Sequence, residues 1–178
     1  RMIAEARLMV RLHKRGLNIP ILYDCDVVEQ QLVMSNVPGQ PLIELLNDDS
    51  IDDATVNEHL RTAGKSVRML HRPAIVHGDL STNNIMITPE GEAVLIDFGL
   101  AKIEFETELY GIDLHVLFEI LGASHPHREG AMEAVLEGYA QCEEDLGPAP
   151  RTSGGDPVSM SDVLERFDLI RTRVRYHG

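Results

Sequence analysis

The sequence predicts an α+β fold in which helices dominate and a few short strands carry polar loops. Three observations lead to this prediction. Several long segments repeat apolar residues at helical spacing, only short apolar runs alternate with turn residues, and two polar motifs directly follow such runs. The first motif is His77-Gly-Asp-Leu-Ser-Thr-Asn-Asn84, and the second is Asp97-Phe-Gly99.

These two motifs have the spacing of a magnesium-dependent phosphoryl-transfer site. Asp79 is followed five residues later by Asn84, and Asp97 follows the apolar run 93–96. Such a site needs one carboxylate to meet the attacking hydroxyl or water, and an amide and a second carboxylate to hold the metal. We therefore expect Asp79 to be catalytic and Asn84 and Asp97 to bind magnesium. Turn residues that served structure alone would not require an asparagine at this offset.

The first part of the chain predicts one helix and two strands. Apolar residues at helical spacing predict a helix over 2–15, and they are Ala4, Leu8 and Leu12. Gly16 is suited to end this helix, and Pro20 cannot continue it. Short strands are expected at 21–23 and 31–34, followed by a linker over 35–39.

The middle of the chain predicts a second helix and the strands that carry the motifs. Asp52 or Asp53 would cap this helix, and its apolar stripe consists of Val56, Leu60, Ala63, Val67 and Leu70. Three short strands should follow, at 75–77, 85–87 and 93–96. Between them, the loops would aim both motifs into one cleft.

The last part of the chain predicts three helices and one long loop. Two helices are expected at 111–121 and 128–146. The segment 147–157 is rich in Pro, Gly and Ser, which predicts a mobile surface loop. A final helix capped by Asp162, with Glu165 in the capping-box position, would precede a basic tail over 171–178.

Composition sets further limits on the protein. The 178 residues carry a formal net charge of −13, and no apolar run approaches the length of a membrane span. No signal peptide is recognisable, and the two distant cysteines suit a reducing compartment, so we expect an intracellular protein. Basic residues gather at both ends of the chain. They are either ordinary solvated faces or surfaces that contact phosphate, RNA or an acidic partner.

With both motifs placed, the chain resembles the small atypical protein kinases of the KEOPS (EKC) complex, the PRPK type. The motifs run in the family's order along nearly the whole chain. Asp-Leu-Ser together with Asp-Phe-Gly also looks like RIO kinases, and His-Gly-Asp occurs in aminoglycoside-type phosphotransferases. Ser124-His-Pro126 and the C-terminal Arg-x-Arg-x-Arg favour the PRPK type, as does the short segment after Gly99.

The resemblance implies a protein-kinase-like fold, mostly the helical C-lobe with a truncated small N-lobe. Residues 1–37 would be the remnant of the N-lobe, and 38–178 the C-lobe with its basic tail. It also implies ATP and Mg²⁺ as cofactors. Adenine would contact the gatekeeper Met34, the linker residues Ser35 and Val37, and the apolar side chains of Met86 and Ile96. Structural support of the site would come from Glu5, His77 and Asp113.

The resemblance implies ATPase or serine/threonine kinase activity that supports threonylcarbamoyladenosine modification of tRNA. Expected partners are the tRNA-modification enzyme, the other KEOPS subunits and, through the basic tail, tRNA itself. Arg171, Arg173 and Arg175 would make the tail contacts. The expected location is the cytoplasm and nucleus, away from membranes. Two alternatives remain: a catalytically impaired docking subunit, and a RIO-like or small-molecule phosphotransferase.

The sequence departs from ordinary kinases in three respects. No Gly-rich phosphate loop or lysine strand precedes Glu5, so the expected partner of this glutamate is missing. Ser81 stands where protein kinases often have a lysine, and there is no Ala-Pro-Glu element. We therefore expect either a fragment of a longer kinase or a catalytically impaired protein. The intact set Asp79, Asn84 and Asp97 favours the fragment.

Overall fold

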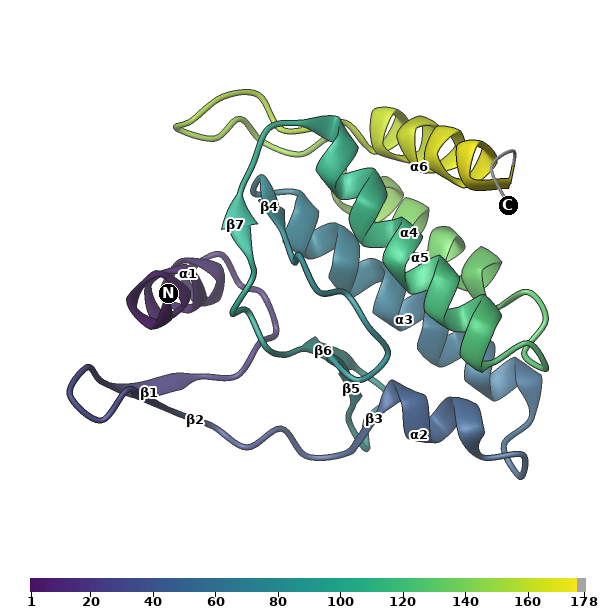
Figure 1. Cartoon of the computed structure of the whole chain (residues 1–178), viewed down its shortest axis with the longest axis horizontal. Coiled ribbons are helices and arrows are strands. Elements are labelled where there is room, and N and C mark those ends of the chain that lie inside the picture. The colour runs from purple at the N-terminus through teal and green to yellow at the C-terminus, as the bar shows by residue number, and fades with distance from the viewer. Residues whose placement is uncertain (176–178) are drawn as a thin grey trace.

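The computed structural model describes residues 1–175, apart from the side chains of Val174 and Arg175. Over this range six helices and seven short strands follow one another (Figure 1). In chain order they are α1 (Met2–Lys14), β1 (Leu22–Asp26), β2 (Gln31–Met34), β3 (Gln40–Pro41), α2 (Leu42–Asn47), α3 (Asp53–His71), β4 (Ile75–Val76), β5 (Ile85–Ile87), β6 (Ala93–Leu95), β7 (Lys102–Ile103), α4 (Thr107–Ser124), α5 (Ala131–Leu146) and α6 (Met160–Arg175). The predicted helix-rich α+β fold is confirmed.

The strands form three small antiparallel sheets. β1 and β2 make a hairpin beside α1, and β3, β5 and β6 form a three-stranded sheet in that order. β4 pairs with β7, so the strand before the first motif is joined to the segment that follows the second. In Figure 1 the β3–β5–β6 sheet and the β4–β7 pair lie between α1 with its hairpin on one side and the helices α3 to α6 on the other. The loops that carry both motifs therefore lie between α1 and the large group of helices.

The core lies mainly among α3, α4, α5 and α6. The predicted stripe of α3 is buried along its whole length, from Val56 to Leu70. Asp52 caps this helix by accepting a hydrogen bond from the backbone N–H of Thr55. Facing it are the buried apolar residues of α4, α5 and α6, including Leu114, Leu117, Leu121, Val135, Tyr139, Val163 and Phe167. No helix of residues 1–175 is both long enough and apolar enough to cross a membrane.

Two glycines let α3 and α5 cross at close range. A Cβ atom added to Gly64 of α3 would lie 1.9 Å from the backbone oxygen of Val135. One added to Gly138 of α5 would lie 1.9 Å from the backbone oxygen of Arg61. Because both neighbours are backbone atoms, neither contact can be relieved by a side-chain rotation. The crossing therefore requires glycine at both positions.

We expect Gly64→Ala to lower the free energy of unfolding by about 2 kcal/mol or more, because overpacking a close contact forces the helices apart. Urea unfolding followed by circular dichroism measures this change. Gly122→Ala in α4 is the matched control, since nothing lies within 4 Å of the added Cβ. The control should be neutral or gain up to about 1 kcal/mol from better helix propensity. Equal effects of the two substitutions would contradict the close crossing.

Three predicted helix boundaries were wrong. α4 begins at Thr107, before the predicted start, because Gly111 lies inside the helix where α6 approaches closely. α5 begins at Ala131, after Gly130 in the left-handed region, while Arg128 stays in the preceding loop. α6 is capped by Ser159, whose Oγ accepts a hydrogen bond from the backbone N–H of Asp162. Asp162 is therefore the third residue of the helix and does not cap it.

Other differences concern short elements and the two ends. The elements α2, β3 and β7 could not be predicted, because they are too short to show a periodic pattern. Ala4 is exposed, and the inner face of α1 is formed by Ala6, Leu8, Met9 and Leu12. The predicted loop 147–157 is anchored at both ends, because Arg72 donates to the Gly147 carbonyl at 2.7 Å and Arg68 donates to the Val158 carbonyl at 3.4 Å.

Candidate active site

The first motif forms a loop between β4 and β5. Its shape is fixed locally, because the Asn84 side-chain amide donates to the Asp79 carbonyl at 2.9 Å and to its carboxylate at 3.2 Å. A backbone hydrogen bond from Asn84 to Ser81, of 3.0 Å, closes the loop. The Asp79 side chain is exposed, while its neighbour Leu80 is buried in the core. The loop thus presents one carboxylate to solvent on a rigid base.

The second motif lies directly beside the first. The backbone N–H of Ile96 donates to the Asn84 carbonyl at 3.0 Å, so Asn84 and Asp97 are adjacent across the β5–β6 pair. Asp97 is a non-glycine residue with a φ of 60°, a conformation that needs support from its surroundings. Its carboxylate accepts a hydrogen bond of 3.2 Å from the backbone N–H of Gly99. The structure therefore brings together all three residues predicted to handle phosphate and metal.

His77 ties the two motifs to each other. Its Nε2 lies 3.1 Å from the Ile96 carbonyl, and because a carbonyl only accepts, Nε2 carries the proton. Its Nδ1 can then accept from the backbone N–H of Asp79, at 3.4 Å. Burial lowers the pKa of His77 and keeps the ring neutral, in spite of nearby carboxylates such as Asp113. The ring thus acts as a fixed spacer between the motifs.

Asp113, on α4, holds the backbone of the first motif from below. Its carboxylate accepts from the N–H of His77 at 2.6 Å and from the N–H of Gly78 at 2.9 Å. The side chain is almost fully buried. Burial alone would favour the neutral acid, but hydrogen bonds from His71 and from these two N–H groups outweigh it and lower the pKa of Asp113. The carboxylate therefore stays charged beneath the loop.

A buried hydrogen-bond network behind Asp113 could not be predicted from the sequence. His71 Nε2 lies 3.2 Å from the Asp113 carboxylate, and His71 Nδ1 lies 2.8 Å from the Tyr139 hydroxyl. Burial lowers the pKa of His71, so the neutral ring donates to Asp113 and accepts from Tyr139. Arg68, with no exposed surface, pairs with Glu143 at 3.0 Å. The only sequence signal was the position of Arg68 and His71 beside the apolar stripe of α3.

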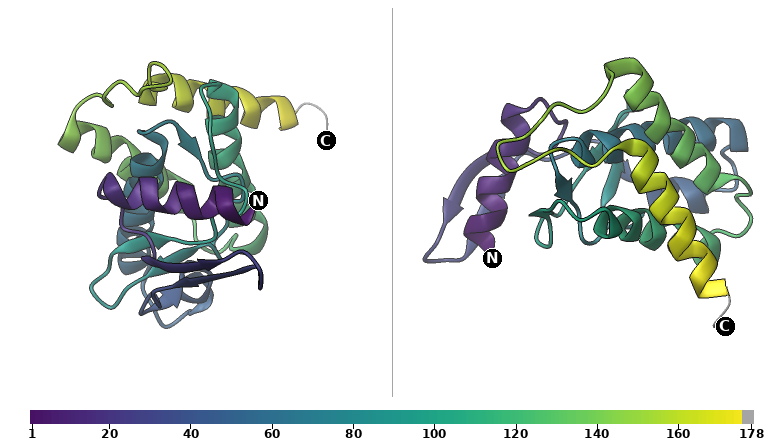
Figure 2. Two further views of the ribbon diagram at one scale, coloured as in Figure 1. Left: turned by 90° about the vertical axis from the view of Figure 1, so that its left-hand side faces the viewer. Right: turned by 90° about the horizontal axis from the view of Figure 1, so that it is seen from above.

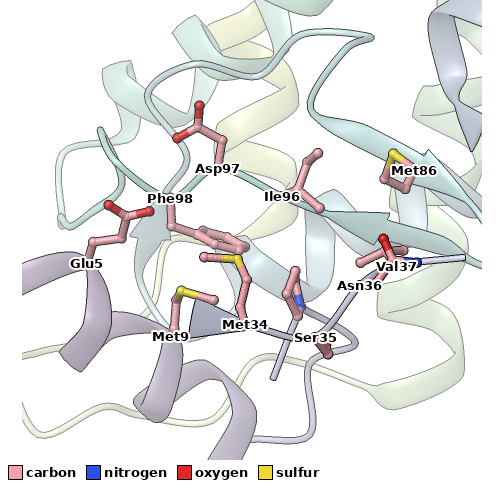
Figure 3. Close-up of a pocket in the computed structure, with 11 residues that line it drawn as sticks. Glu5, Met9, Met34, Ser35, Asn36, Val37, Met86, Ile96, Asp97 and Phe98 are labelled. Carbon is pink, nitrogen blue, oxygen red and sulfur yellow. The ribbon is translucent and has the colours of Figure 1, made fainter. Parts of the chain in front are cut away.

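A cavity of about 400 Å³ lies next to the motifs, between α1, the linker after β2 and the β5–β6 sheet (Figure 3). It contains every residue predicted to contact adenine: Met34, Ser35, Val37, Met86 and Ile96. The other lining residues are Glu5, Met9, Pro20, Asn36, Asp97 and Phe98. Most of its wall is apolar, and Figure 3 shows the carboxylates of Glu5 and Asp97 together at one end. The cavity thus has an apolar part and an acidic end.

A second hollow, of about 520 Å³, continues from this acidic end and shares Glu5 and Asp97 with the first. Arg1 lines it, and its Nε donates to the Gly99 carbonyl at 3.0 Å. Partial burial raises the pKa of Glu5, and the nearby Asp97 carboxylate adds to this rise. No lysine lines either hollow among the residues that the structure describes. Two close carboxylates would favour a cation between them.

The residues present fit ATP and Mg²⁺. The cavity has the usual size of a small-ligand site, and the backbone N–H and C=O of Val37 form no hydrogen bond among the described residues. A flat heterocycle between the apolar side chains could therefore bond to this linker. Asn84 and Asp97 would hold Mg²⁺, which prefers oxygen ligands and usually takes few from the protein.

The predicted basic tail needs correction. Residues 171–175 continue α6, and Arg171 pairs with Asp168 at 2.9 Å. Its guanidinium also lies over the rings of Phe118 and Phe167, at 5.8 and 5.6 Å from their centroids. Arg173 is exposed, whereas the side chain of Arg175 and residues 176–178 lie outside the described part. Arg171 therefore serves the fold and is not on a free tail.

Comparison with known proteins identifies the family. The RIO domain family matches residues 2–105. The chain is 37% identical to the KEOPS complex subunit Bud32 of Pyrococcus abyssi over 178 residues, which cover 99% of the chain and 74% of that protein. The chain belongs to the Bud32 family of RIO-domain proteins. The predicted resemblance to the KEOPS kinase is thereby confirmed, and the protein is kinase-like.

Other Bud32 relatives differ in length. A probable bifunctional tRNA threonylcarbamoyladenosine biosynthesis protein of Methanoculleus marisnigri is 39% identical over 173 residues, which cover 97% of the chain and 28% of that protein. The EKC/KEOPS complex subunit BUD32 of Gibberella zeae is 31% identical over 158 residues, or 79% of the chain and 60% of that protein. The Bud32-like chain thus spans about a quarter of the bifunctional relative.

Proposed function

We propose that this Bud32-family chain binds Mg-ATP in the cleft and turns it over, as an ATPase or a serine/threonine kinase, in support of threonylcarbamoyladenosine modification of tRNA. The observation that carries the proposal is the meeting of Asp79, Asn84 and Asp97 beside a cavity of about 400 Å³. The names of its relatives supply the tRNA context, and other KEOPS subunits would be its partners.

In this mechanism Asp79 accepts or orients the proton of the attacking hydroxyl or water. The hydrogen bonds from Asn84 fix the direction of its carboxylate, and Asp113 fixes the backbone on which it stands. Bound Mg²⁺ would supply charge neutralisation at the phosphates. Met34, Met86 and Ile96 would exclude water from the base, and such positioning with electrostatics is the main source of rate in phosphoryl transfer.

The same cleft supports a division into two lobes. Residues 1–37 form one wall of the cavity through α1 and the linker, and the later residues form the other. We infer that the former is the small-lobe part and the latter the large-lobe part of a kinase. The phosphate acceptor is a protein hydroxyl in the kinase form of the proposal and water in the ATPase form. Cytoplasm and nucleus remain the expected compartments.

A docking role is the second candidate. The names of two relatives favour it, because both are subunits of a complex. In this version the helical part of the chain would bind the modification enzyme without ATP turnover. The exposed Arg173 is a candidate contact, since Arg171 is engaged within the fold.

Reconstitution separates the two candidates. We would combine the chain with the other KEOPS subunits of Pyrococcus abyssi and measure threonylcarbamoyladenosine in tRNA by mass spectrometry of nucleosides. The proposal predicts that the wild-type chain restores the modification and that Asp97→Asn does not. Equal restoration by both would favour the docking role. The Bud32 subunit of Pyrococcus abyssi serves as the positive control. If that subunit stimulates the reaction but this chain does not, both the turnover and the docking candidates are contradicted.

A further inference from the structure

The ion pairs of this protein are distributed unevenly. Every described cationic side chain between residues 61 and 171 pairs with a carboxylate within 4.0 Å: Arg61, Lys65, Arg68, Arg72, Lys102, Arg128, Arg151, Arg166 and Arg171. In contrast, none of the basic residues of 1–15 has such a partner among the described residues. This is notable in a chain with a net charge of −13, where carboxylates are abundant.

Three of these basic residues lie on one face of α1. Arg7, Arg11 and Lys14 follow one another at i, i+4 and i+7, so they share a stripe of the helix. Arg15 extends this stripe just beyond the helix end. We call these four residues the α1 basic face. It lies opposite the buried face of α1, which contains Leu8, Met9 and Leu12.

The α1 basic face is open in the structure. Figure 2 shows α1 crossing the front of the molecule above the β1–β2 hairpin, with no other helix or strand of residues 1–175 in front of it. Arg7, Lys14 and Arg15 are exposed, and Arg11 is half-buried. Glu5 is the one acidic side chain of the helix, and it points into the cavity on the other side. The outer face therefore carries positive charge without internal compensation.

We propose that the α1 basic face binds the phosphate backbone of RNA. A polyanion is repelled by most of this acidic protein and can approach only where the local charge is positive. From Arg7 to Lys14 the helix rises by roughly 10 Å, a distance over which a nucleic-acid duplex presents about six phosphates. The inference deepens the proposed tRNA function and rests on it for the class of RNA.

Two features favour RNA over a membrane surface. A helix that lies in a bilayer interface needs a wide apolar face, and the outer side of α1 offers only Ile3 and Val10, each a little over 40% exposed. Phosphate contacts, in contrast, need only aligned cations on a rigid element. The opposite side of α1 carries Glu5, which lines the cavity. RNA on the basic face and a nucleotide in the cavity would therefore contact the same helix.

Salt-dependent binding of an unmodified tRNA transcript tests this inference. We would compare the full chain with the triple variant Arg7→Ala, Arg11→Ala, Lys14→Ala by fluorescence anisotropy at several salt concentrations. Loss of three phosphate contacts should reduce the slope of log K against log salt by about 2 to 3. At low salt the affinity should fall at least tenfold. Alanine is the best helix former, so α1 should remain helical, and circular dichroism checks this.

A matched control separates local from global charge effects. The variant Arg61→Ala, Lys65→Ala, Lys102→Ala removes the same charge from paired positions that are exposed or half-buried, and it should bind tRNA within about twofold of wild type. An unchanged salt slope in the α1 variant would overturn the inference, as would equal losses in both variants. Tighter binding of wild type to anionic vesicles than to tRNA at the same salt would also overturn it.

Two variants distinguish a failure of this inference from a failure of the proposed function: the α1 variant and Asp79→Asn. Basal ATP turnover without RNA should be unchanged in the α1 variant, because its three residues line neither hollow and belong to neither motif. Asp79→Asn should lose turnover and still bind tRNA as wild type does. Normal tRNA binding by the α1 variant would reject the α1 basic face alone. Normal turnover by Asp79→Asn would reject the proposed catalysis alone.

Discussion

Asp79→Asn is expected to lower ATP turnover by at least about a hundredfold, because a general base contributes 10² to 10⁴ in rate and an amide cannot take up the proton. The fold should be unaffected, since the Asp79 side chain is exposed and an amide oxygen can still accept from Asn84. Phosphate release under saturating Mg-ATP measures the effect. Urea unfolding of the same sample checks that stability is retained.

The control for this substitution is Glu90→Gln, which also converts an exposed carboxylate to an amide but lies in the turn between β5 and β6. It should keep wild-type turnover. If Asp79→Asn retained turnover within about threefold of wild type, a general-base role for Asp79 would be rejected, because even weak base catalysis exceeds this factor.

Asp113→Ala is expected to give the largest loss of stability, about 3 to 5 kcal/mol in the free energy of unfolding. The substitution leaves three donors without their acceptor: the buried N–H of His77, the buried Nε2 of His71 and the partly buried N–H of Gly78. Urea or thermal unfolding measures the loss. Turnover should fall as well, because the backbone beneath Asp79 would no longer be fixed.

Asp113→Asn separates the charge of Asp113 from its hydrogen bonds. The amide keeps one acceptor oxygen, so it should lose less stability than Asp113→Ala. His71→Gln is a second probe, because it can still donate to Asp113 but alters the contact with Tyr139. If Asp113→Ala cost less than about 1 kcal/mol, the carboxylate would not be supporting the catalytic loop, since even one orphaned buried donor costs that much.

Long periodic elements could be predicted from the sequence, and this has a physical reason. The stripe of α3 from Val56 to Leu70 faces one continuous core, so its spacing directly records burial. The strand 85–87 was also predicted with its observed bounds, since flanking polar motifs mark both ends. The loop residues were found because phosphoryl transfer requires particular residue types at particular offsets.

What could not be predicted depends on contacts between distant segments. The sequence predicts a helix that begins at Gly111, but Gly111 lies within α4, where α6 approaches too closely for a side chain. The sequence predicts Arg171 in a basic tail, but in the structure it contacts two aromatic rings and pairs with Asp168. The link from Asp113 through His71 to Tyr139 joins residues that are far apart in sequence. The spacing of residues along the chain does not reveal such contacts.

The most direct test of the central claim is calorimetric titration of the full chain with ATP, with and without Mg²⁺. The cleft predicts one binding site per chain, stronger binding with Mg²⁺, and at least about tenfold weaker Mg-ATP binding by Asp97→Asn, since a charged metal ligand contributes more than 1.4 kcal/mol. Absence of binding at millimolar Mg-ATP, or identical binding by wild type and Asp97→Asn, would contradict the assignment of the cleft.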